Sequence, residues 1–154
     1  RSGIPDARPT IGAMSDRAMS DVDDVDRLLT LAREVQRHAH VPYSNFPVGA
    51  ALVTSTGRVF VGANIENAAY GPTICAERVA IFSAITAGES QILAVAVCTE
   101  NGATPCGSCR QVMREFARDL PVFICDTAGN SHETSLAALL PDSFGPEDLK
   151  ESRQ

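Results

Sequence analysis

Two short apolar segments separated by a helical pattern constrain the fold of this chain more than any other feature. Residues 92–99 and 122–125 are runs of apolar residues with the length of buried strands. The helical pattern between them extends from about residue 107 to 118. Because a strand-helix-strand unit crosses over to a parallel neighbour, these segments predict an α/β fold with a mixed sheet and helices on its faces.

The remaining segments complete an alternating order of helices and strands. Residues 20–23 resemble a capping box, and apolar residues follow at helical spacing up to Ala39. Thr56-Gly57 separates two β-rich runs and predicts a hairpin. The expected elements in order are helix 20–39, strands 48–55 and 58–65, helix 73–87 closed by Gly88, strand 92–99, helix 107–118, strand 122–125 and helix 135–140.

The length and charge of the chain exclude several classes of protein. A chain of 154 residues can form one domain that buries roughly two-thirds of its unfolded surface, so it needs no disulfide framework. The odd count of five cysteines agrees and favours the reducing cytoplasm. A net charge of −6 with no basic tract argues against a nucleic-acid partner.

The sequence predicts no targeting or membrane segment. No window approaches the roughly 18 to 20 consecutive apolar residues of a membrane span. The N-terminus lacks the apolar centre of a signal peptide. We expect residues 1–19 to be a flexible extension or a remnant of an expression vector, residues 20–145 to form the functional domain, and residues 146–154 to be a C-terminal tail.

One expected helix has no charged face. Residues 79–87 carry apolar side chains all round, and a helix that is apolar on every face is buried on every face. The sheet can cover one side only. The pattern therefore predicts that a second subunit covers the other side.

Three cysteines and one carboxylate carry the clearest chemical signal. Thr73 is a candidate N-cap, which would place Cys75 in the first turn of its helix, where the helix dipole stabilises a thiolate. Cys106 and Cys109 are spaced by one turn of the next helix and can clamp one ion. Three thiolates suit Zn²⁺ and leave a fourth position open for water, as in catalytic zinc sites.

Glu77 supplies the base that such an open position requires. It follows Cys75 by two residues, so it can accept a proton from a bound water without being a ligand. Zn²⁺ with three thiolates has a formal charge of −1, and Arg78, Arg110 and the helix N-termini are candidates to offset it. Two alternatives stay open: a redox Cys-x-x-Cys pair, or a structural zinc site whose fourth ligand is Cys98, Cys125 or, from a polar loop, His132.

Four segments together resemble the small, homotetrameric cytidine deaminases over about residues 21–145. The first two are Cys75-Ala76-Glu77-Arg78 and Pro105-Cys106-Gly107-Ser108-Cys109-Arg110-Gln111. The others are Tyr43-Ser44-Asn45-Phe46-Pro47-Val48-Gly49-Ala50-Ala51 and Asn64-Ile65-Glu66-Asn67-Ala68-Ala69-Tyr70. The resemblance implies a three-layer αβα fold with a central mixed sheet of about five strands, and a homotetramer with sites at subunit interfaces.

The resemblance also implies a reaction. A zinc ion on Cys75, Cys106 and Cys109, one per chain, would acidify a water. Glu77 would deliver the proton of this water to N3 of cytosine and, in a later step, protonate the departing amine. Cytidine and 2′-deoxycytidine would become uridine and 2′-deoxyuridine with release of ammonia, a hydrolase reaction of pyrimidine salvage. The rivals are a nucleotide deaminase and an aminonucleoside-antibiotic deaminase. The loop 99–105 is short for the family, which affects the rim of the site.

The substrate contacts rest partly on spacing and partly on the resemblance. On a strand, Asn64 and Glu66 would share one face and could together hold a sugar hydroxyl, which the resemblance identifies as the ribose 3′-OH. Backbone N–H groups near Cys75 and Ala76 suit a carbonyl oxygen of the base. By resemblance, Phe46 packs on the nucleoside, Phe144 packs on the pyrimidine, the loop with Ala68 and Tyr70 reaches a neighbour's site, and Arg78 bonds ligand sulfurs.

Overall fold

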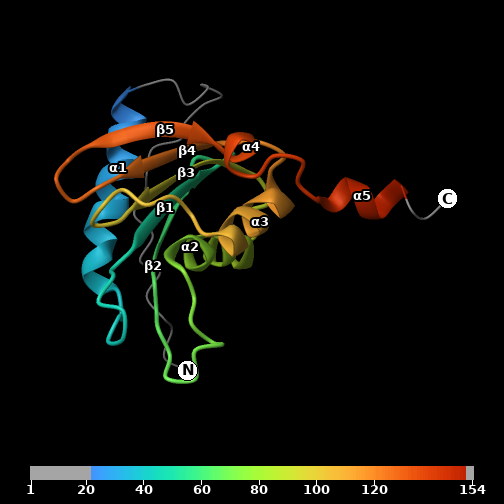
Figure 1. Cartoon of the computed structure of the whole chain (residues 1–154). Helices are drawn as coiled ribbons and strands as arrows, with labels where there is room; N and C mark the ends of the chain where they lie inside the picture. The colour runs from blue at the N-terminus through green and yellow to red at the C-terminus, as the bar shows by residue number, and fades with distance from the viewer. Residues whose placement is uncertain (1–21, 152–154) are drawn as a thin grey trace, which may run out of the picture.

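A computed structural model describes residues 22–151, which form one five-stranded sheet with helices on both faces (Figure 1). The strand order is β2-β1-β3-β4-β5; β3 and β4 pair in parallel, and the other three pairs are antiparallel. The strands are β1 (Gly49–Thr54), β2 (Val59–Ala63), β3 (Ile92–Cys98), β4 (Pro121–Cys125) and β5 (Ser131–Ser135). The helices are α1 (Val22–Val35) with a 3₁₀ turn (Gln36–His38), α2 (Ala76–Thr86), α3 (Gly107–Phe116), α4 (Leu136–Leu139) and α5 (Pro146–Glu151).

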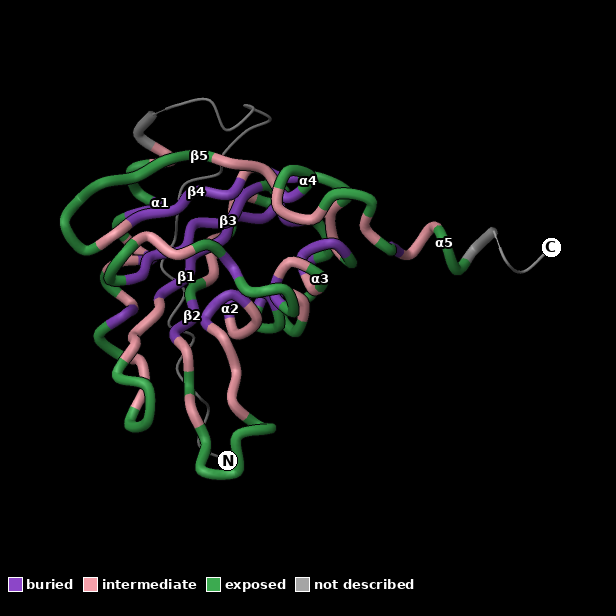
Figure 2. The backbone as a smooth tube through the Cα atoms, in the orientation of Figure 1, coloured by how far each residue is buried: buried purple, intermediate pink, exposed green. Residues whose placement is uncertain are grey.

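The three layers follow from the alternation of side chains along the central strands, which are buried on both faces (Figure 2). One face of the sheet packs with the apolar residues of α2 and α3, and the opposite face packs with α1. The first face presents Ala50, Leu52, Val95, Val97, Val122 and Ile124. The second presents Ala51, Val53, Ala94, Ala96, Cys98, Phe123 and Cys125.

The predicted order of elements is confirmed, with two additions near the C-terminus. Residues 131–135 form the edge strand β5, so His132 lies in a strand opposite Ile124 and the prediction of a loop there was wrong. The polar sequence Ser-His-Glu-Thr-Ser carries no apolar alternation, because a solvent-exposed edge strand has little to bury. A short helix, α5, occupies most of the expected tail. The capping box at 20–23 begins outside the described residues.

The turns that join these elements are those the sequence indicates. Gly57, at a φ of 79°, closes the β1–β2 hairpin. Gly88, at a φ of 88°, follows the end of α2, where its N–H donates to the Ile85 carbonyl. Ser135 caps α4 by accepting from the Ala138 N–H at 3.2 Å. Gly88 thus ends a helix and Ser135 starts one, as their backbone and side-chain chemistry predicts.

The helices α2 and α3 begin on the same side of the sheet. Both follow the carboxyl ends of strands that run in one direction, β2 and β3, so their N-termini come together. Gly62 on β2 sets the distance of α2 from the sheet, because a Cβ there would lie 2.4 Å from the Ala76 carbonyl oxygen and 2.6 Å from the Ala80 nitrogen. The start of α2 is therefore held directly against the backbone of β2.

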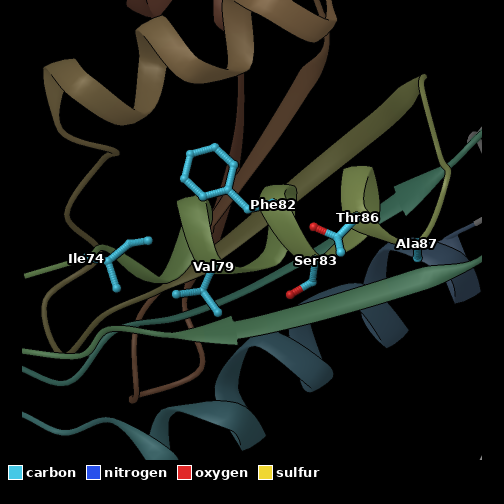
Figure 3. A pocket seen from close by; sticks show the side chains of 6 residues that line it. All are labelled: Ile74, Val79, Phe82, Ser83, Thr86 and Ala87. Carbon is cyan, nitrogen blue, oxygen red and sulfur yellow. The ribbon is translucent and has the colours of Figure 1, made fainter. Parts of the chain in front are cut away.

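The outward side of α2 is apolar and only partly covered in the single chain. Phe82 is 43% exposed. A groove beside it is lined by Ile74, Val79, Phe82, Ser83, Thr86 and Ala87 (Figure 3). Within residues 22–151, no helix has the length and apolar character needed to cross a membrane.

Candidate active site and metal centre

Three sulfur atoms meet where α2 and α3 begin. The Sγ atoms of Cys75 and Cys106 are 3.8 Å apart, and those of Cys106 and Cys109 are 3.5 Å apart. All three ligand atoms lie within 4.8 Å of one another. The structure thus brings together the three thiols that the sequence predicts as a ligand set.

Two of the thiols reach this position as helix caps, and the third, Cys109, lies in the first turn of α3. Cys75 is the N-cap of α2 and Cys106 the N-cap of α3, both with extended backbone. The predicted cap at Thr73 was wrong, because the Thr73 hydroxyl instead accepts from the Asn67 N–H at 3.0 Å. Two thiols at N-caps lie beside the unpaired N–H groups and positive dipole ends of two helices, which favour thiolates.

The geometry of the cluster fits a zinc ion. Tetrahedral ligands at the Zn–S distance of about 2.3 Å lie roughly 3.8 Å apart, close to the two measured sulfur separations. Among the described residues, no fourth His, Cys, Asp or Glu joins the group. Cys98 and Cys125 pack on the opposite face of the sheet, beside α1. Three protein ligands with an open fourth position are typical of catalytic rather than structural zinc.

Hydrogen bonding within the cluster separates the acidities of its thiols. A hydrogen bond from Cys109, together with Arg78, lowers the pKa of Cys75 to about 5. The same bond, with burial, raises the pKa of Cys109. Cys75, which accepts a hydrogen bond from Arg78, is therefore more acidic than Cys109.

Glu77 lies in the first turn of α2, beside the sulfurs. The residue is 3% exposed, and burial raises the pKa of its carboxyl group above the ordinary value. The neighbouring Cys109 thiol acts in the opposite direction on this pKa, so the carboxyl lies next to the cluster. A buried carboxyl group at this point can accept and return a proton next to the open metal position.

The two arginines near the cysteines have different roles. Arg78 Nη2 donates to the Cys75 sulfur at 3.5 Å, while its Nε is buried and, in the described part of the chain, has no hydrogen-bond partner. Arg110, the other candidate to offset the charge of the thiolates, is bound elsewhere. Its guanidinium donates to the carbonyls of Pro105 and Leu139, at 2.7 Å each, and to the Thr104 hydroxyl. Arg78 alone of the pair faces the negative cluster, and Arg110 joins α3 to α4.

Asn64 and Glu66 lie just after β2 and not on it, so the premise of a shared strand face was wrong. The Asn64 amide nevertheless accepts from the Val48 N–H at 2.8 Å and donates to the Phe46 carbonyl at 2.9 Å. The Glu66 carboxylate accepts from the Tyr43 N–H at 2.8 Å and from Ser44. A hydrogen bond from Ser44 lowers the pKa of Glu66, which stays ionised at neutral pH.

This polar group is tied to the metal centre through the backbone. Ile65, between Asn64 and Glu66, exchanges hydrogen bonds of 3.0 Å with Ile74, the residue before Cys75. The half-buried Phe46 belongs to the same group through its carbonyl. The structure therefore brings the predicted sugar contacts and the ligand set into one continuous region.

The loop of Ala68 and Tyr70 extends into solvent. Tyr70 is 74% exposed, and at a φ of 58° it adopts a conformation that is rare for a bulky residue. Its ring meets the exposed Tyr43 ring edge-on at 6.1 Å. Tyr43 was not predicted as a partner of Tyr70, because no spacing in the sequence links residues 27 positions apart.

Phe144 is held beside α3, the helix that carries Cys109. Its carbonyl accepts from the Gln111 side chain at 3.0 Å, and the residue is 58% exposed. The loop before α3 closes on itself, since the Thr99 hydroxyl accepts from the Ala103 N–H at 2.7 Å. Ala76, fully buried, opens α2 with an N–H that has no partner within the helix.

Comparison with known proteins yields one family. The cytidine and deoxycytidylate deaminase zinc-binding region matches residues 22–125. A cytidine deaminase of Sporosarcina psychrophila is 46% identical over 129 residues, which cover 82% of this chain and 95% of that protein. The crystal structure of a Burkholderia pseudomallei cytidine deaminase superposes with a TM-score of 0.74 at 47% identity and covers 77% of this chain and 98% of that one. A Mycobacterium tuberculosis cytidine deaminase structure gives 0.70 at 38% identity, over 81% and 99% of the two chains.

The family match covers the sulfur cluster, Glu77 and strands β1 to β4, and the comparisons agree with the three-layer fold and with the chemistry of the donor set. The chain belongs to the zinc-binding cytidine and deoxycytidylate deaminase family.

Proposed function

We propose that this protein deaminates cytidine and 2′-deoxycytidine hydrolytically to uridine and 2′-deoxyuridine with release of ammonia, as an enzyme of pyrimidine salvage. The observation that carries the proposal is the buried Glu77 carboxyl beside three sulfurs at the start of two helices. The relatives named cytidine deaminase support the choice of substrate.

Cys75, Cys106 and Cys109 are the proposed ligands of one zinc ion per chain, which when bound supplies the Lewis acidity that makes water a nucleophile at neutral pH. Arg78 offsets the excess negative charge of three thiolates through its contact with Cys75. Glu77 accepts the proton of the attacking water and delivers it to N3 of cytosine as C4 is attacked. The same carboxylate then takes the proton of the new C4 hydroxyl group and gives it to the amine, which leaves as ammonia while the C4 carbonyl forms.

The remaining site residues bind the nucleoside. The Ala76 N–H at the start of α2 is placed to bind the carbonyl oxygen of the base. Asn64 and Glu66, already oriented by the 43–48 segment, retain acceptor and donor capacity for the ribose 3′-OH. The rings of Phe46 and Phe144 enclose the nucleoside, and Ala68 and Tyr70 extend to the site of a neighbouring subunit.

We also infer that the enzyme is a homotetramer of the cytoplasm. The support for assembly is the apolar outward side of α2, where Phe82 and the groove beside it lack a cover (Figure 3). The support for a reducing compartment is that all five cysteines are free thiols. Sedimentation equilibrium tests the assembly, since a stable monomer contradicts it.

The function is tested with four substrates and a metal determination. Absorbance loss is followed on cytidine, 2′-deoxycytidine, cytidine monophosphate and adenosine, with zinc measured per chain. We expect turnover of the first two and about one zinc per chain. The ionised Glu66 disfavours a phosphate next to the ribose, so efficient use of the monophosphate would favour the nucleotide deaminase rival. Zinc without turnover of any of the four contradicts the proposal.

A further inference from the structure

The segment around Phe144 combines an exposed ring with a backbone that is fixed on both sides. Its carbonyl accepts from Gln111 of α3, and the residue remains 58% exposed. An aromatic residue that only anchors a chain terminus buries its ring. Here polar contacts fix the backbone and the ring stays available, which is the arrangement of a side chain presented to a ligand.

Arg114, in the last turn of α3, supplies most of this fixation. The Arg114 side chain is 7% exposed, its Nε donates to the Ser143 hydroxyl at 2.8 Å, and its Nη2 forms an ion pair with Glu147. A buried guanidinium is tolerated because it is paired and hydrogen-bonded. Its two partners lie one residue before and three residues after Phe144, so one side chain holds the turn from both ends.

The shape of the turn depends on the same guanidinium. Gly145 packs directly on it, because a Cβ at this position would lie 2.4 Å from Arg114 Cζ and Nη2. The Gly145 N–H donates to the Asp148 carboxylate at 2.7 Å. Asp142 adopts a φ of 50°, in the left-handed region, two residues before Phe144. Residues 142–148 therefore form a defined turn built around Arg114, at the junction of α4 and α5 beside α3 (Figure 1).

We propose that Arg114 is a positioning residue for substrate binding, acting through Ser143 and Glu147 to hold the Phe144 ring against the nucleoside base. The inference rests on the proposed function. It assigns Arg114 no contact with the substrate. A contact that stabilises the bound base equally before and during the reaction changes KM and leaves kcat nearly unchanged.

The test compares KM and kcat for cytidine in Arg114→Met, Arg114→Lys and Phe144→Ala. For Arg114→Met we expect KM to rise about tenfold and kcat to stay within about threefold of the parent. This rise in KM is smaller than the roughly 100-fold loss that a 1 Å misplacement can cause. Lysine can reach one of the two partners, so Arg114→Lys is expected to restore part of the affinity. In the Phe144→Ala background, Arg114→Met should change KM no further, because the ring it positions is gone.

Two further variants separate positioning from general stability. Glu147→Ala removes the half-exposed partner of Arg114 and leaves the core filled, so it tests the proposal even if Arg114→Met fails to fold. We expect Glu147→Ala to raise KM, as Arg114→Met does. Arg58→Met breaks a comparable ion pair, with Glu89 at 2.9 Å at the far end of α2, and should lower the melting temperature without changing KM. Unchanged KM in both Arg114→Met and Glu147→Ala, or effects that add to those of Phe144→Ala, overturns the inference. Absence of turnover in the unmodified enzyme instead overturns the proposed function.

Discussion

The five cysteines of this chain divide into two groups that share a residue type and little else. Cys75, Cys106 and Cys109 gather at the starts of α2 and α3, with an exposure that ranges from fully buried to exposed. Cys98 and Cys125 face each other across the paired strands β3 and β4, both buried against α1. The first group can hold an ion, while the second packs like small apolar side chains.

The backbone around a cysteine therefore determines its chemistry. An N-cap thiol sits beside free N–H groups that favour the thiolate, whereas a thiol within a buried strand has no such donors and stays protonated. Burial, reinforced by the neighbouring Cys98, raises the pKa of Cys125 to about 12.

Loss of a helix-start thiol should have the largest effect. We expect Cys109→Ala to bind zinc poorly and to lose deaminase activity by more than the roughly 100-fold that removal of a partner outside the ligand set costs. Cys98→Ala is the matched control and should keep both zinc and activity. Metal analysis and cytidine turnover on the two variants check this, and equal behaviour of the two would remove the distinction between the groups.

Glu77→Gln separates metal binding from proton transfer within the first group. The amide keeps the shape of the side chain but cannot accept and return a proton. We expect zinc near one per chain and a rate lower by about 10²- to 10⁴-fold. Glu115→Gln, on the exposed side of α3, serves as the control with parental rate. Near-parental activity in Glu77→Gln would show that another group carries the proton.

Metal removal should expose one group of thiols and leave the other hidden. After chelation at pH 8, we expect an alkylating reagent to modify Cys75 and Cys106, which are at least partly exposed. Because the pKa of Cys125 is raised, its reactive thiolate forms only as the pH approaches about 12, and it should react only after denaturation. Peptide mapping by mass spectrometry gives the sites. Modification of Cys125 in the folded protein would contradict its assignment to the core.

The smallest expected effect is on stability. Cys98→Ala removes one buried sulfur and should lower the free energy of unfolding by about 1 kcal/mol, in the range of a single deleted methyl group. Urea denaturation with zinc present measures it. A loss several times larger would mean that the Cys98 sulfur does more than pack.

The division of the cysteines could be predicted from sequence because their neighbours differ. Cys98 and Cys125 end runs of alanine, valine and isoleucine, while the other three follow Pro, Ile or Ser at helix starts. What the sequence did not show were contacts between distant segments. Thr73 accepts a hydrogen bond from Asn67, and Arg110 donates to the carbonyls of Pro105 and of Leu139 in α4. Neither residue therefore takes the role that its local sequence suggests.

The edge strand β5 and the C-terminal segment could also not be predicted from local sequence. β5 is stabilised by backbone pairing with β4. Polar side chains are compatible with this pairing, but they do not predict it. Asn64 and Glu66 lie past the end of β2, yet their hydrogen bonds to the 43–48 segment still orient them together. The chemistry of a motif was therefore easier to predict than the backbone that presents it.

The close contact of Gly62 with α2 makes this position intolerant of substitution. Any side chain at position 62 must push away the Ala76 carbonyl and the Ala80 nitrogen, and with them the turn that carries Glu77. Replacement of Gly62 by any other residue should therefore inactivate the enzyme from within a strand, at a position that touches no reacting atom. A screen for inactive variants should recover position 62 alongside the metal ligands, and only the distance between two backbones explains why.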